Sequence, residues 1–340
     1  MRLPLFRSKT KPGVPDHSLY STEGAIGMKV LSDPSNADLD IVFVHGLTGN
    51  REKTWTHENG TLWPRDLLAK DLPKTRIMTF GYDVDIFNFT SITFSDRLYD
   101  HSQSLAYAVV SQRIDCSTRP ILFIAHSLGG LVCQQALILS NSIDGLWEIS
   151  SSAIGVVFMG TPHYGSSLAS YREKLAKGMK IVHTVNRDMV GALHPDSNNV
   201  QRVGNGFQSM LHRGDLSLKI CCFYEEKKMD DIVGKIVEEH SAVLRGHENC
   251  GIDADHYNMT KFGSHADGGY GLVRSVITGW LHESRGGDAI SKTDMSASVL
   301  GNPAWLGTWT PGNFYFNGTT NSQNFAQGYY THAEQYFAFD

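Results

Sequence analysis

The stretch AHSLG, residues 125–129, combines a serine with the small neighbours that a tight turn between a strand and a helix requires. It follows an apolar run that ends at Ile124 and leads into a helix-like stretch. In such a strained turn the serine Oγ projects at the amino end of the helix, where negative charge is favoured. Residues two before and two after it press on neighbouring backbone, so only small side chains fit. The pattern predicts Ser127 as a nucleophile; the alternative is that it only caps the helix.

A serine hydroxyl is a poor nucleophile unless a base accepts its proton. When a serine follows a strand in this way, the acid and then the histidine come later in the chain. His256 in DADHYNMTKF (253–262) lies between a polar turn and a short apolar segment, so we expect it to be the base. The other histidines of this region are alternatives: His240, His247 and His265.

The acid that orients the base is expected just after the preceding strand, KICCFYEE at residues 219–226. Glu225 is the first choice, with Glu226 and Asp231 as rivals. Its carboxylate would accept the second ring N–H of His256, fix the tautomer and stabilise the imidazolium. The alternative for a glutamate at a strand end is a solvated loop carboxylate.

Two backbone N–H groups are expected to stabilise the oxyanion that forms when the serine attacks. The tripeptide HGL, residues 45–47, ends an earlier apolar run, where enzymes with this serine turn place one donor. We therefore expect the N–H groups of Leu47 and Leu128 to form the oxyanion hole. His45 precedes the serine in the chain, so we expect it to orient its loop rather than to act as the base.

Short apolar runs rich in Val, Ile and Phe recur along the chain, as buried parallel strands do. They cover residues 41–46, 76–83, 121–127, 153–162 and 218–226. Helix-like stretches alternate with them at residues 62–72, 96–113, 128–139 and 269–283, and residues 27–33 add a candidate edge strand. The alternation predicts an α/β fold, a mostly parallel sheet covered by helices on both faces.

The bulk composition is that of a soluble globular chain, with 41% hydrophobic and 19% charged residues among 340. A net charge of −5 gives no reason to expect nucleic-acid binding. Five cysteines without a CxxC pair indicate reduced thiols. Since the sequence shows neither a signal-peptide core nor an apolar run of transmembrane length, we expect a cytoplasmic protein whose membrane contact, if any, is peripheral.

Two further stretches suggest phosphate or metal binding but fail on spacing. In GLTGNREKT (46–54) the second glycine does not directly precede the Lys-Thr pair of a phosphate loop. HENCGIDADH (247–256) lacks the paired short spacings of structural zinc sites. We therefore expect neither a cofactor nor a metal.

The composition changes after Glu283, and no charged side chain occurs between Met295 and Ala333. We divide the chain into an N-terminal extension (1–24), a main domain (25–283), a polar linker (284–294) and a tail (295–340) rich in Asn, Gln, Gly and aromatic residues. Such a composition favours cross-β stacking, so we expect residues 312–330 to nucleate fibrils. The alternatives are an inert tail and a gene-model artefact.

Five blocks occur in one order over residues 25 to 283: VFVHGLTGN (42–50), LWPRDLLAKDLPKTRIMTFGYD (62–83), FIAHSLGGLVCQQAL (123–137), FMGTPHYGS (158–166) and CCFYEE to DADHYNMTKF (221–262). In these blocks the chain resembles lipase-like α/β-hydrolases of the fungal SesB type, related to the animal serine-active-site-containing protein and the GPI inositol-deacylase. The resemblance implies an α/β-hydrolase fold and cofactor-free ester or lipid hydrolysis by Ser127, His256 and Glu225. The residues expected to line the substrate site are His45, Gly46, His126, His163 and Tyr164.

The leading expectation is therefore a serine esterase or lipase that acts through an acyl-enzyme. The alternative is a catalytically weak hydrolase fold that signals when its C-terminal tail assembles, and a peptidase of the same fold is less favoured. Some SesB-type proteins carry short amyloid-forming motifs that template onto a receptor. The resemblance thus implies a NACHT- or STAND-type receptor as a partner and a role in fungal cell death or incompatibility.

Overall fold

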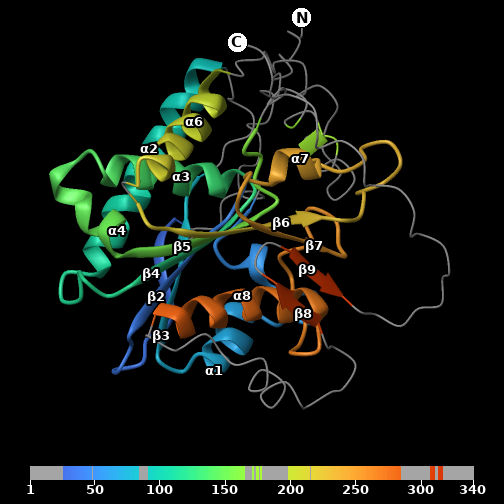
Figure 1. Ribbon diagram of the computed structural model, residues 1–340, viewed down its shortest axis with the longest axis horizontal. Helices are drawn as coiled ribbons and strands as arrows, with labels where there is room; N and C mark the ends of the chain where they lie inside the picture. Colours follow the sequence, from blue (N-terminus) through green and yellow to red (C-terminus); the bar gives the residue numbers. More distant parts are fainter. Residues whose placement is uncertain are drawn as a thin grey trace, which may run out of the picture. The chain divides into compact units, whose positions relative to one another are not determined.

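The first of the chain's two units, Met1–Asp288, contains a seven-stranded sheet (Figure 1). The computed structural model describes residues 26–47, 49–83, 91–164, 171, 174–175, 177, 198–214, 216–284, 307–310 and 313–316. The strands lie in the order β1-β3-β2-β4-β5-β6-β7. β1 runs antiparallel to β3, and the other neighbouring pairs are parallel. The bounds are β1 Gly27–Ser32, β2 Leu39–Val44, β3 Thr75–Gly81, β4 Ile121–His126, β5 Ala153–Met159, β6 Lys219–Glu225 and β7 Glu248–Ile252.

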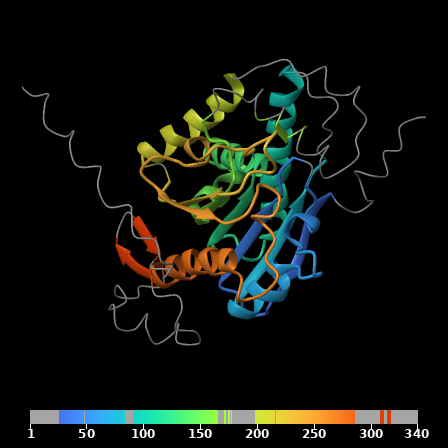
Figure 2. The ribbon, with the colours of Figure 1, turned by 90° about the vertical axis from the view of Figure 1, so that its right-hand side faces the viewer.

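Helices cover both faces of this sheet, as Figures 1 and 2 show. One face packs against α2 (Ser91–Gln112), α3 (Leu128–Ser140), α4 (Trp147–Ser152) and α6 (Asn198–His212). The other packs against α8 (Gly268–Ser284) and against a π-helical turn, Pro64–Leu68, that continues into α1 (Ala69–Asp71). Shorter elements are the 3₁₀ turns Lys53–Trp55 and Asp144–Leu146 and the helix α7, Glu239–Ala242.

The central strand β2 explains why the sheet appears in the sequence as continuous apolar runs. Ile41 and Phe43 belong to the core under α8, whereas Val42 and Val44 belong to the core under α2 and α3. β2 therefore buries both of its faces, as do its neighbours β3 and β4. This architecture confirms the predicted α/β-hydrolase fold, with the five apolar strands and the edge strand in the expected places.

The sheet and its helices differ from the prediction in several places: α4 and α6 have no counterpart among the expected helices, and two further elements differ as follows. The stretch 62–72 is not one α-helix, because its first turn, Pro64–Leu68, is π-helical. β7 has no counterpart among the expected strands, because its first two residues, Glu248 and Asn249, are exposed and polar. A strand at the edge of a sheet needs only one apolar side, so hydrophobicity alone does not mark it.

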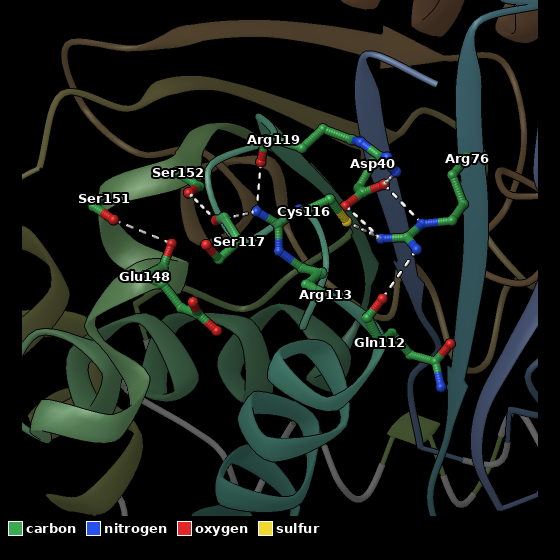
Figure 3. A network of polar contacts seen from close by, with 10 residues as sticks. All are labelled: Asp40, Arg76, Gln112, Arg113, Cys116, Ser117, Arg119, Glu148, Ser151 and Ser152. Atoms are coloured by element: carbon green, nitrogen blue, oxygen red, sulfur yellow. Dashed lines mark hydrogen bonds and ion pairs between the residues drawn. The ribbon is translucent and has the colours of Figure 1, made fainter. Parts of the chain in front are cut away.

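A buried ionic cluster joins the amino ends of the central strands (Figure 3). Asp40, near the start of β2, is fully buried and accepts two hydrogen bonds from Arg76 of β3, at 2.9 and 2.8 Å. Arg113 and Arg119 also contact this carboxylate. Three guanidinium groups around one carboxylate tie β2, β3 and the segment after α2 together, at the end of the sheet opposite to Ser127.

The second unit, Ala289–Asp340, contains a hairpin of β8 (Gly307–Thr310) and β9 (Asn313–Phe316). The strands pair antiparallel, with Thr308 opposite Tyr315. The start of the predicted fibril segment is thus a strand, while residues 317–330 and the extension 1–24 lie outside the described part of the chain. Within the described residues, no helix combines the length and hydropathy needed to cross a bilayer.

Candidate active site

Ser127 occupies the turn between β4 and α3 in a strained backbone conformation. Its backbone angles are φ 57° and ψ −129°. Among the described residues other than glycine, it alone has a positive φ. Its N–H donates to the Met159 carbonyl, 2.8 Å away at the end of β5. A strained serine held by the neighbouring strand directly before a helix is the geometry expected of a nucleophile elbow.

The glycines around Ser127 are required by close contact with the His45 backbone and with the serine itself. A Cβ on Gly129 would lie 2.3 Å from the His45 carbonyl oxygen, and one on Gly46 would lie 2.5 Å from the Ser127 Cβ. Ala125, two residues before the serine, is fully buried. The small residues on both sides of the serine therefore allow β2, β4 and α3 to converge on it.

His256 and Glu225 come together beside this turn. The His256 Nδ1 lies 3.4 Å from the Glu225 Oε1, and both side chains are fully buried. Glu225 is the last residue of β6, and its Oε1 also accepts a hydrogen bond of 2.6 Å from the Val237 N–H. Gly160, with φ of 59°, leaves room for the imidazole, since a Cβ there would lie 3.0 Å from the ring. His256 and Glu225 thus form a buried pair at ion-pair distance, and neither ring nitrogen of His256 has a hydrogen-bond partner among the described residues.

The rival acids and histidines lie elsewhere in the structure. Glu226 is exposed and lies over Gly251, and the Asp231 side chain is fully exposed. His240 is exposed as well, and the half-exposed His265 lies beside Asp71. Of these candidate acids, Glu225 lies within ion-pair distance of His256, which favours the first choice for the acid.

The Ser127 hydroxyl is bound to a residue that the sequence did not mark. Its Oγ shares a hydrogen bond with the hydroxyl of Tyr171, and the His256 Nε2 has no hydrogen-bond partner among the described residues. Tyr171 lies 44 residues after the serine, in a stretch without a recognisable motif. Only the folded chain brings its side chain to Ser127.

The expected oxyanion hole lies where β2 ends against the start of α3. Leu47 and Leu128 are both buried, and Leu128 is the first residue of α3. His45 holds the loop before Leu47: its Nδ1 lies 2.8 Å from the Gly46 carbonyl, and its ring stacks on Tyr82 at 4.5 Å. Burial lowers the pKa of His45 to about 4, so its imidazole is neutral near pH 7. The role of His45 in orienting the loop stays a prediction, which the contact with the Gly46 carbonyl favours.

Two other histidines expected at the substrate site, His126 and His163, are buried, as Ser127 itself is. The His126 Nε2 donates to the His256 carbonyl at 2.9 Å and so positions the backbone of the base. The His163 ring accepts a 2.7 Å hydrogen bond from Gln134 and packs on Phe158, and burial lowers its pKa to about 3. The hydrogen bonds of these two rings go to the His256 carbonyl and to Gln134 rather than to the Ser127 hydroxyl. Tyr164, half-buried, pairs its hydroxyl with Gln208.

Comparisons with known proteins place this geometry in context. Residues 34–199 match a family model described as "Putative serine esterase (DUF676)". Protein SERAC1 of Homo sapiens is 28% identical over 156 residues, covering 41% of this chain and 24% of the relative. Protein SERAC1 of Danio rerio is 25% identical over 250 residues, covering 65% of this chain and 36% of the relative. The chain thus spans about a quarter to a third of the length of these relatives, and the match to a serine esterase family supports a hydrolase.

Similar solved structures include two lipase-like proteins. The mature lipase BlEst2 of Bacillus licheniformis is 19% identical with a TM-score of 0.45, covering 74% of this chain and 96% of that chain. A lipase-esterase related protein from Clostridium acetobutylicum is 10% identical with a TM-score of 0.43, covering 76% of this chain and 100% of that chain. The fold assignment rests on the strand order and on the serine turn described above.

Proposed function

We propose that this chain is a serine hydrolase that cleaves carboxylic esters, including lipid esters, through an acyl-enzyme. One observation carries the proposal: a serine with φ of 57° directly follows His126, whose ring hydrogen-bonds to the backbone of His256, and the buried His256 Nδ1 is 3.4 Å from a buried glutamate. A strained serine and a fully buried imidazole–carboxylate pair are costly to maintain for stability alone. They are the groups that acyl transfer requires.

In the proposed reaction, the Ser127 Oγ attacks the ester carbonyl carbon while the His256 Nε2 accepts the hydroxyl proton. The N–H groups of Leu47 and Leu128 donate to the oxyanion. His256 then returns the proton to the departing alcohol, and the C–O bond to it breaks. Water attacks the acyl-enzyme with the same histidine as base, which releases the acid and restores Ser127. Glu225 holds the Nδ1 proton and stabilises the imidazolium throughout.

An activity screen tests the proposal and defines the substrate. p-Nitrophenyl esters of graded acyl length and phospholipid vesicles are offered to the wild type, to Ser127→Ala and to His256→Ala. We expect Ser127→Ala to abolish turnover and His256→Ala to lower it by roughly 10³-fold or more. His265→Ala, a change at an exposed histidine of the same region, is the matched control and should retain full activity. A twofold loss for His256→Ala would show that another group is the base.

A second candidate function, assembly through the tail, is favoured by the hairpin in the second unit. Strands β8 and β9 belong to the charge-free region 295–333, and four residues of each pair across the hairpin. Uncharged strands with aromatic and Asn-rich neighbours are suited to stacking between copies. In this scheme the tail recruits a receptor module or further copies of the chain. A peptide of residues 307–330 that stays monomeric and thioflavin-negative at high concentration would exclude it.

A further inference from the structure

Tyr171 places its hydroxyl where a substrate's carbonyl oxygen would have to bind. Its oxygen hydrogen-bonds with the Ser127 Oγ, and the backbone of Leu128, the next residue, lies close enough to this oxygen to counteract the rise in the phenol's pKa that burial causes. These two groups are the nucleophile and an expected oxyanion donor. An oxyanion formed on an acyl group attached to Ser127 must neighbour both of them. The phenol oxygen therefore occupies the space that this oxyanion would need.

The same contact keeps Ser127 away from its base. The serine hydroxyl is engaged by Tyr171, while the His256 Nε2 is buried without a hydrogen-bond partner among the described residues. The Tyr171 ring lies edge-on to the His256 ring, with centroids 6.4 Å apart. Ser127, Tyr171 and His256 are all at least 95% buried. A substrate acyl group can reach the serine only after the phenol has moved.

We propose that the Tyr171 hydroxyl is an internal occupant of the oxyanion hole, which the substrate carbonyl must displace, so that this residue controls substrate binding. The proposal rests on the hydrolase function proposed above. Burial raises the pKa of Tyr171, so the occupant is a neutral phenol. A hole formed by N–H donors binds a developing negative charge more strongly than a neutral hydroxyl. The transition state therefore competes well against Tyr171, whereas the ground-state ester competes poorly.

This competition predicts how the kinetic constants change. If only the fraction of molecules with an empty hole binds substrate, the apparent dissociation constant is raised by the inverse of that fraction. Removing the hydroxyl removes at least one hydrogen bond that holds the occupant, a change of about two- to tenfold in an equilibrium. We expect Tyr171→Phe to lower KM by about that factor and to leave kcat within about twofold of the wild-type value.

Covalent modification of the serine provides the test. A fluorophosphonate transfers its phosphonyl group to the Ser127 Oγ and releases fluoride, and its phosphoryl oxygen must enter the oxyanion hole. The second-order rate constant of modification is measured by intact mass for the wild type, Tyr171→Phe and Tyr270→Phe, together with KM and kcat on a short-chain ester. Tyr270→Phe is the matched control, because it removes the hydroxyl of another buried tyrosine, which lies on α8 and donates to Asp71 of α1.

A two- to tenfold faster modification of Tyr171→Phe alone, with a lower KM, supports the proposal. Modification of Tyr171→Phe but not of the wild type would support it more strongly. A fall in kcat of tenfold or more with unchanged KM overturns it, because Tyr171 would then be a donor to the oxyanion. Equal rates for the wild type and Tyr171→Phe also overturn it while leaving the hydrolase intact. Absence of modification in every variant removes the proposed function itself.

Discussion

The substitution Glu225→Gln tests the assignment of the acid with little disturbance to the fold. Glutamine has the shape of glutamate and keeps an oxygen that can accept the 2.6 Å hydrogen bond from the Val237 N–H. It carries no charge, so it cannot stabilise an imidazolium whose Nδ1 lies 3.4 Å away. Because the pair is fully buried, water cannot replace the lost charge.

The expected loss in kcat for Glu225→Gln is about 10³- to 10⁴-fold, the effect of replacing the carboxylate of such a triad by its amide. At about 1.36 kcal/mol per factor of ten, this corresponds to roughly 4 to 5.5 kcal/mol of transition-state stabilisation. KM should change little, because the carboxylate acts through His256 and does not touch the substrate.

The assay compares the kcat of Glu225→Gln with that of Glu226→Gln on one ester. Glu226 is the next residue in the chain and is exposed, so its amide variant should keep wild-type activity. Urea unfolding of both variants verifies that each is folded. A folded Glu225→Gln protein with less than a tenfold loss would refute the assignment, and a large loss for Glu226→Gln instead would identify the rival.

Asp40→Asn should lower the free energy of unfolding by about 3–5 kcal/mol, measured in urea, because it leaves buried guanidinium groups without their carboxylate; a loss below 1 kcal/mol would contradict this. Gly46→Ala should lower kcat by roughly 100-fold by displacing Ser127, whereas Gly145→Ala, where a Cβ meets nothing within 4 Å, should not. Stability should fall by up to about 1.4 kcal/mol per pH unit for each buried neutral histidine as pH drops from 6.5 toward 4, and His163→Gln should flatten that slope.

The sign of the pH effect follows from the direction of the pKa shifts. Burial lowers the pKa of His45 to about 4 and that of His163 to about 3, below the ordinary 6.5 of the unfolded chain. Between these values the unfolded state binds protons that the folded state does not. The free energy of unfolding is therefore unaffected by these two imidazoles above pH 6.5. It decreases as the pH falls from 6.5 toward their pKa values in the folded protein.

Sequence patterns predicted the parts of the structure that depend on local chemistry. Strands buried on both faces are continuous apolar runs, and the turn around Ser127 needs small residues at fixed positions. Both signals lie within a few neighbouring residues. The amphipathic spacing of α8 is of the same kind. These features can be recognised before any long-range contact is known.

The remaining features depend on contacts between distant segments. Glu225 and Glu226 are adjacent and chemically identical, and only the path of the loop after β7 brings His256 to one of them. His163 was expected at the substrate site, but packing places it in the core against Gln134. Tyr171 carries no local pattern, because its contact with Ser127 arises from the fold alone.

The most direct test of the account is active-site labelling with a fluorophosphonate followed by peptide mass spectrometry. The account predicts one phosphonyl group per chain, located on the peptide that contains Ser127, and no labelling of Ser127→Ala. If neither the folded wild type nor the folded Tyr171→Phe variant is labelled, the central claim is contradicted. Labelling that persists in Ser127→Ala would show that the nucleophile is another residue.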